Sequence, residues 1–153
     1  MGAEDRLAQL KLELPPAPKP VATYVTALRV GDMLYVSGHG PLRADGTMIT
    51  GKVGLDLDVT AGMAAARQTG LAILATVRDH LGSLDKVARL VKTLGMVNCT
   101  HEYGDQPKVI NGFSDLMKEV FGDAGVGARS AVGMGALPGG IAVEIEAIFQ
   151  VKD

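Results

Sequence analysis

Two segments near the end of the chain carry the charged side chains that remain as candidates for chemistry. Arg129 lies in one run of β-type residues, and Glu144 and Glu146 alternate with apolar residues in the next. A guanidinium group binds a carboxylate through two parallel hydrogen bonds, and a carboxylate can accept a proton from water. From the pattern alone, the same residues could form a surface ion pair contributing about 0 to 1 kcal/mol. Both interpretations stay open at this point.

Other kinds of chemistry lack the residues that they need. His39, His80 and His101 are far apart and Cys99 is the only cysteine, so no metal site with ordinary ligand spacing is expected. The glycine-rich segments match neither the dinucleotide nor the Walker pattern, and Ser37 lacks the flanking glycines of a hydrolase nucleophile. The sequence therefore predicts neither a metal nor another cofactor.

Composition favours one globular domain and disfavours nucleic acid as a partner. The 153 residues are 47% hydrophobic and 21% charged, with a formal net charge of −2, no Trp and three each of Tyr and Phe. A weakly acidic chain with few aromatic rings is poorly suited to nucleic acid. The charged first residues and interrupted apolar runs predict neither a signal peptide nor a membrane span. A single cysteine fits a reducing compartment, so a cytoplasmic location is expected.

The first 20 residues are predicted to be a short helix followed by a stiff linker. Three leucines could lie along a helix over residues 4–12, and the proline-rich segment 15–20 must end it. We interpret residues 1–20 as an extension and residues 21–153 as the main domain.

A hairpin is expected next. Two β-type runs, residues 24–30 and 33–37, flank the turn dipeptide Gly31-Asp32. The second run ends at Ser37-Gly38-His39-Gly40-Pro41, where glycines allow backbone angles closed to other residues and the proline prevents strand pairing. Such a strand end can expose its backbone to a ligand.

The middle of the chain shows two helical patterns around one β-type run. Apolar residues three or four apart predict a helix from Asp58 or Thr60 to about Leu81, and a second helix after Pro107. A buried strand is expected between them at residues 88–97.

The end of the chain predicts a second hairpin. The runs 129–134 and 141–151 flank residues 137–140, a proline- and glycine-rich turn. Alternation places both glutamates on the face opposite the most apolar residues of the last run. A turn centred on this segment would put Arg129 opposite Ile148, on the glutamate face.

These elements together predict an α+β fold in which two helices pack on one face of the sheet. The other face then needs its own cover, which self-association could supply.

Separate blocks of the sequence, in order and spacing, resemble the RidA/YjgF family, whose members are also called endoribonuclease L-PSP proteins. The resemblance covers roughly residues 21–151, and the segment 105–112 and the N-terminal helix resemble a longer-chain branch of the family. Its most specific blocks are Ala128-Arg129-Ser130-Ala131-Val132, Leu137-Pro138 and Val143-Glu144-Ile145-Glu146-Ala147, supported by Tyr24-Val25, Gly31-Asp32-Met33, Val36-Ser37-Gly38 and Pro41.

The resemblance implies a chorismate-mutase-like fold with a mixed, mostly antiparallel sheet, and a homotrimer whose sites lie between subunits. It also implies hydrolysis of reactive 2-imino or enamine acids to 2-oxo acids and ammonia, without a metal. In that reaction Arg129 would hold the substrate carboxylate and Glu144 would position or activate water.

Other positions match the family's pocket or depart from it. The residues that the resemblance places at the substrate are Tyr24, Ser37, Gly38, Asn111 and Ala131. Many members have a cysteine where this chain has Ala131, and the segment Gly133-Met134-Gly135 that follows is unusually open. The departures allow a different pocket shape and substrate.

Two other functions stay open. A trimer could bind a carboxylate metabolite in the same pocket without catalysis, because a fold does not fix a function. RNA cleavage is suggested by the family label, but the net charge and the low aromatic content disfavour it.

Overall fold

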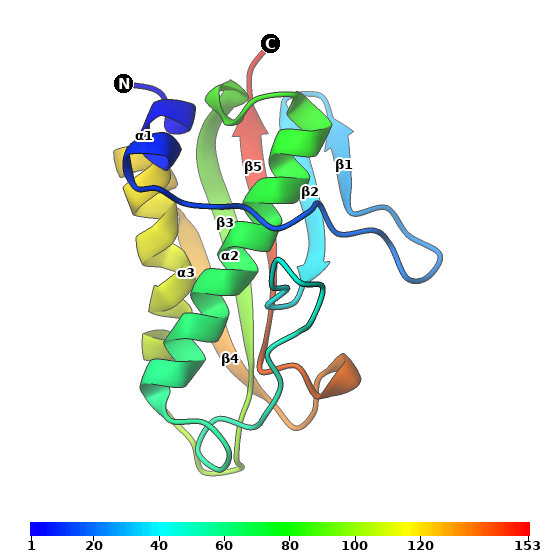
Figure 1. Cartoon of the computed structure of the whole chain (residues 1–153), viewed down its shortest axis with the longest axis vertical. Coiled ribbons are helices and arrows are strands. Elements are labelled where there is room, and N and C mark those ends of the chain that lie inside the picture. The colour runs from blue at the N-terminus through cyan, green and yellow to red at the C-terminus, as the bar shows by residue number, and fades with distance from the viewer.

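One layer of helices covers one face of a five-stranded sheet in the computed structural model, which describes all 153 residues (Figure 1). The main elements are α1 (Ala3–Gln9), β1 (Ala27–Val30), β2 (Met33–His39), α2 (Val59–Leu81), β3 (Val87–Asn98), α3 (Gln106–Phe121), β4 (Ala128–Met134) and β5 (Val143–Val151). Short 3-10 helices follow α2, α3 and β4, namely η1 (Leu84–Lys86), η2 (Gly122–Gly125) and η3 (Pro138–Gly140).

The sheet is mixed, as predicted. Its order is β1-β2-β5-β3-β4, and every neighbouring pair is antiparallel except β3 and β4. The first predicted hairpin, β1 with β2, is confirmed, but β1 begins at Ala27 rather than Tyr24 and β2 continues to His39. The second predicted hairpin is wrong, because the long strand β3 lies between β4 and β5 and pairs with both. Pairing between segments far apart in sequence is not visible in a local turn pattern.

This order changes the face on which Arg129 lies. Arg129 is level with Thr93 of β3 and therefore with Ala147 of β5, rather than with Ile148. Residues that are level across a sheet share a face. Arg129 is thus on the side of buried Ala147, and Glu144 is on the other side. The prediction that Arg129 shares the glutamate face is wrong.

The two long helices form where the sequence predicts them. The side chain of Asp58 accepts a hydrogen bond from the Ala61 N–H at 2.8 Å and so caps α2. Gly82 ends this helix in a left-handed conformation with φ 84°. Helix α3 tolerates Pro107 because that residue lies in its first turn.

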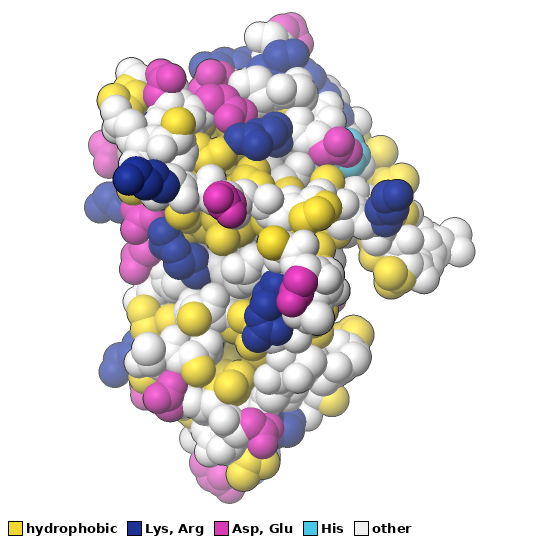
Figure 2. Space-filling model, in the orientation of Figure 1, with side chains coloured by type: hydrophobic (Ala, Val, Ile, Leu, Met, Phe, Trp, Pro, Cys, Tyr) yellow, Lys and Arg dark blue, Asp and Glu magenta, His cyan; other side chains and the backbone are white.

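Both helices lie over the same face of the sheet. Val143, Ile145 and Phe149 of β5 are completely buried beneath them. The opposite face has no helix, and it exposes Leu28 and Tyr35 to 56% and 46% of their surfaces. On the helix-bearing side, basic and acidic side chains are interspersed, without a large patch of one sign (Figure 2).

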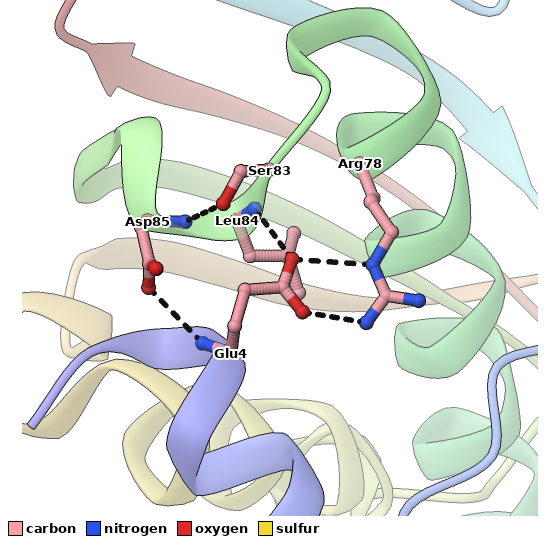
Figure 3. A network of polar contacts seen from close by, with 5 residues as sticks. All are labelled: Glu4, Arg78, Ser83, Leu84 and Asp85. Carbon is pink, nitrogen blue, oxygen red and sulfur yellow. Dashed lines mark hydrogen bonds and ion pairs between the residues drawn. The ribbon is translucent and has the colours of Figure 1, made fainter.

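The N-terminal extension is fastened to the ends of the helices. Ala3 and Leu7 of α1 are part of the main hydrophobic core. Glu4 accepts hydrogen bonds from Arg78 of α2 and from the Leu84 N–H, while its own N–H donates to Asp85 (Figure 3). The chain then crosses the outer side of α2 towards β1 (Figure 1). None of the helices is both long and apolar enough to span a membrane.

Candidate active site

A cavity of about 360 Å³ opens where β2 and β5 meet the N-terminal linker. Three of the site residues implied by the resemblance line it, namely Tyr24, Gly38 and Glu144. They come from three separate segments, so the cavity depends on the complete fold.

Glu144 is a half-buried carboxylate without a partner. It forms no ion pair, and neither hydrogen bonds nor cations contribute to the pKa of its carboxyl group. Burial raises that pKa above the usual value, and the negative charge of Glu146 raises it further. A raised pKa makes the ionised form a stronger base, so Glu144 can take a proton from water.

Gly38 creates the space beside this carboxylate. The β2–β5 register shifts between Val36 and His39, which brings Gly38 against Glu144. A Cβ atom at residue 38 would lie 2.9 Å from Glu144 Oε1, so any larger residue would displace the Glu144 carboxylate from this position. Neither Gly38 nor Gly40 has a positive φ. The prediction of unusual backbone angles here is therefore wrong, and the small size of Gly38 leaves room for the Glu144 carboxylate.

His39 fixes the end of β2, a role that the sequence did not predict. Its Nδ1 lies 2.6 Å from the Ser37 carbonyl oxygen, so Nδ1 carries the proton and donates. Its Nε2 then accepts from the Thr76 hydroxyl at 2.7 Å. Burial lowers the pKa of His39, and His80 also lowers it, which keeps the ring neutral. The ring thus ties the strand end to α2.

Ser37 ties β2 to the segment that carries Tyr24. Its hydroxyl donates to the Val25 carbonyl oxygen at 2.6 Å. Ser37, Tyr24 and Glu146 line a second, larger groove of about 620 Å³ on the face without helices. Tyr24 lines both spaces, so it marks where the cavity and the groove join.

Arg129 lies on the helix side of the sheet, at the edge formed by β4. Its Nη1 donates to Ser114 Oγ at 3.1 Å, and its Nη2 donates to the Pro107 carbonyl oxygen at 3.2 Å. Arg129 forms no ion pair, so a surface pair with Glu144 or Glu146 does not exist in this chain. Its cation is held only by neutral acceptors and remains available to an anion.

Asn111 and Ala131 lie on the same side as Arg129. Pro107, Asn111 and Ser114 are four and three residues apart on α3, so they share one helix face. Ala131 follows Arg129 by two residues on β4, which places both on one face of the strand. Ala131 is partly buried against the core.

Residues 4–140 match the family described as "YjgF/chorismate mutase-like, putative endoribonuclease". The chain belongs to this family. The match includes most of the N-terminal extension and the strands β1 to β4, and it ends before β5. The fold described above is the family's chorismate-mutase-like α+β fold.

Members of the YjgF family carry different functional names. A Trypanosoma cruzi protein named TCP17 is 40% identical over 96% of this chain and 92% of its own length. A Dermatophagoides farinae 2-iminobutanoate/2-iminopropanoate deaminase is 30% identical over 92% and 95%. A Shewanella oneidensis structure described as a "putative endoribonuclease" is 28% identical, with a TM-score of 0.94, over 99% of this chain and all of that one.

In this YjgF-family chain, the predicted site residues fall into two groups. Glu144, Gly38 and Tyr24 share a cavity on one side, whereas Arg129 contacts α3, the helix that carries Asn111, on the other. One strand, β3, separates the strands that carry Glu144 and Arg129. A single chain therefore does not bring its candidate base and its candidate carboxylate-binding residue together.

The N-terminal linker adds two residues that the sequence did not place at the site. Pro18 and Lys19 line the Glu144 cavity. The proline-rich composition indicated only a spacer, and no pattern in the sequence links residue 19 to residue 144. For metals, no group of three or more His, Cys, Asp or Glu residues is positioned to hold an ion.

Proposed function

We propose that the protein hydrolyses reactive 2-imino or enamine acids to 2-oxo acids and ammonia, in a site made by two subunits. Glu144, an unpaired carboxylate of raised pKa in a cavity, carries this proposal. The relative that is a 2-iminobutanoate/2-iminopropanoate deaminase supports the same reaction.

The proposed reaction needs one base and one anchor. Arg129 binds the carboxylate of the substrate with its guanidinium, which fixes the imine carbon. Glu144 takes a proton from water as the water oxygen bonds to that carbon. That proton is delivered to the imine nitrogen, which gives a carbinolamine. Glu144 then transfers the proton of the carbinolamine hydroxyl to the nitrogen as the C=O bond forms, the C–N bond breaks, and ammonia leaves the 2-oxo acid. No electrons are exchanged with a cofactor, so the residues present suffice for every step.

Two subunits are required because Arg129 and Glu144 lie on opposite faces of one sheet. The face without helices exposes Leu28 and Tyr35 and contains a groove lined largely by hydrophobic residues, features that favour burial against another copy. A closed homotrimer would cover this face and bring Arg129 of one subunit to the Glu144 cavity of another.

A direct assay of ammonia release tests this function. An amino acid oxidase generates the 2-imino acid in place, and ammonia formation is followed with and without the protein. We expect the protein to accelerate release, with EDTA having no effect. Light scattering on the same sample should give three times the mass of the chain. Absence of any acceleration would contradict the function, and a stable monomer would contradict the shared site.

A carboxylate-binding protein without catalysis is the second candidate. Arg129 favours this candidate, because its guanidinium is held by neutral acceptors and lies apart from Glu144. It can therefore bind an anion independently of the base. Tight binding of a 2-oxo acid together with no ammonia release would select this alternative. For RNA cleavage, the net charge of −2 gives no support.

A further inference from the structure

A second cation without an acidic partner lies in a separate cavity of about 470 Å³. Lys52 lines this cavity, and its ammonium donates to Asn98 Oδ1 at 2.9 Å and to the Gly135 carbonyl oxygen at 2.6 Å. Both acceptors are neutral, and Lys52 takes part in no ion pair. Because an ammonium has three N–H groups, one donor remains for a ligand.

The chain around Lys52 holds this ammonium in place. The backbone N–H of Lys52 donates to Asp56 Oδ2 at 2.8 Å, so the nearby carboxylate binds the main chain rather than the ammonium. Val53 then forms a bridge to Cys99 at the end of β3. A half-buried cation that is positioned but not neutralised favours an anionic ligand.

Gly133 keeps the cavity open. A Cβ atom at this position would lie 2.8 Å from both Cys99 Sγ and Gln106 Nε2. The cavity lies at the carboxyl ends of the parallel strands β3 and β4, where Gly133 is level with Val97. The glycine-rich segment 133–135, which departs from the family pattern, therefore lines this cavity.

The Lys52 cavity adjoins the place where Arg129 lies. Arg129 donates to the carbonyl of Pro107, and the neighbouring residue Gln106 lines the Lys52 cavity. Arg129, Ala131 and Gly133 follow one another on the same face of β4. Two cations therefore lie at the two ends of a strip whose intervening residues have small side chains or none.

We propose that Lys52 is a specificity-determining residue that binds the distal carboxylate of a dicarboxylic 2-imino acid, while Arg129 binds the carboxylate next to the imine. This rests on the function proposed above. No Phe, Tyr or Trp lines the cavity, and its lining is mostly polar or small, which fits a small aliphatic acid.

Two ligands of equal chain length test the proposal by calorimetry on the intact protein: 2-oxoglutarate with two carboxylates, and 2-oxopentanoate with one. Lys52→Met should weaken 2-oxoglutarate binding by about 10- to 100-fold and leave 2-oxopentanoate within about threefold. Lys86→Met, an exposed lysine of η1, is the matched control and should change neither affinity. Gly133→Ala, which narrows the cavity without removing the cation, should weaken the dicarboxylate selectively.

The outcomes separate this proposal from the proposed function. If Lys52→Met changes neither affinity, or weakens both ligands equally, then Lys52 is not the distal contact and the proposal is overturned. Arg129→Ala should weaken both ligands. If it weakens neither, the function proposed for the Arg129 site fails, whatever Lys52 does.

Discussion

Glu4 and Glu144 are both partly buried carboxylates, but their surroundings are opposite. Glu4 accepts from Arg78 Nε at 3.2 Å, from Arg78 Nη2 at 2.7 Å and from the Leu84 N–H at 2.9 Å (Figure 3). Burial acts to raise its pKa, but the Arg78 and Leu84 hydrogen bonds outweigh burial and the pKa is lowered. Glu144 has no such donors, and burial and Glu146 raise its pKa.

The difference separates a stabilising carboxylate from one suited to catalysis. A carboxyl group whose pKa falls on folding stabilises the folded protein at neutral pH, whereas one whose pKa rises opposes folding there. A group that opposes folding and faces a cavity is typical of a functional site. Glu4 thus fastens α1 to the core, and Glu144 is the candidate base.

The largest effect is expected from Glu144→Gln. The amide keeps the size of the side chain but cannot act as a base, so imine turnover should fall by about 10²- to 10⁴-fold. Binding of an unreactive 2-oxo acid should persist, as calorimetry would show. Glu146→Gln changes a neighbour on the same face of β5 and should retain most activity. If Glu146→Gln loses turnover instead, the base is Glu146 and the assignment to Glu144 is wrong.

A smaller effect is expected for Arg129→Ala, which removes the anchor rather than the base. Affinity for a 2-oxo acid should fall by about 10- to 150-fold, the loss of one charge-assisted contact. Arg67→Ala, which breaks an exposed pair with Glu119, is the control and should leave affinity unchanged. Unaltered affinity in the Arg129 variant would mean that the carboxylate binds elsewhere.

Stability should distinguish the two glutamates directly. Glu4→Gln should destabilise the protein by about 1 to 2 kcal/mol, a value reduced for the partial exposure of the pair, and lower Tm by a few degrees. Glu144→Gln should leave Tm unchanged or raise it, and exposed Glu13→Gln is the neutral control. Since the folded-state pKa of Glu4 is lowered, its contribution should be present above its usual pKa of 4.5 and disappear as pH falls through the folded value. Equal Tm changes in the Glu4 and Glu144 variants would contradict the view that Glu4 stabilises the fold and Glu144 does not.

The smallest expected effect is a shift in the pH at which kcat/KM falls on the acidic side. A base must be ionised, so kcat/KM should fall as pH drops through the pKa of Glu144, which lies above the usual 4.5. Glu146→Gln removes one of the two causes of that shift and should move the fall to lower pH. A profile that does not move in this variant would show that another group controls it.

Local patterns were sufficient to predict the helices and the first hairpin. Helix α2 has an apolar periodicity, a capping aspartate and a terminal glycine, each of which acts within a few residues. The turn Gly31-Asp32 joins strands that do pair, and Gly31 has the positive φ of 62° that such a turn needs. Segments of this kind fold as their own sequence indicates.

The arrangement of the site could not be predicted in the same way. Residues 137–140 form a turn as expected, but β3 lies between β4 and β5. Arg129 is therefore on the face opposite the one predicted from a β4–β5 hairpin. Contacts of Gly38 with Glu144, and of Lys19 with the same cavity, join segments more than 100 residues apart. The residue types indicated the chemistry, but the long-range pairing determined which residues meet.

Mixing two impaired variants tests the shared site most directly. Arg129→Ala and Glu144→Gln chains, refolded together in equal amounts with different affinity tags, should form oligomers that contain both. If each site takes Arg129 from one subunit and Glu144 from another, about a quarter of the sites in a random mixture have both residues, and about a quarter of wild-type turnover should return. Doubly tagged oligomers with no more turnover than the parent variants would show that one chain supplies both residues, contrary to the structure.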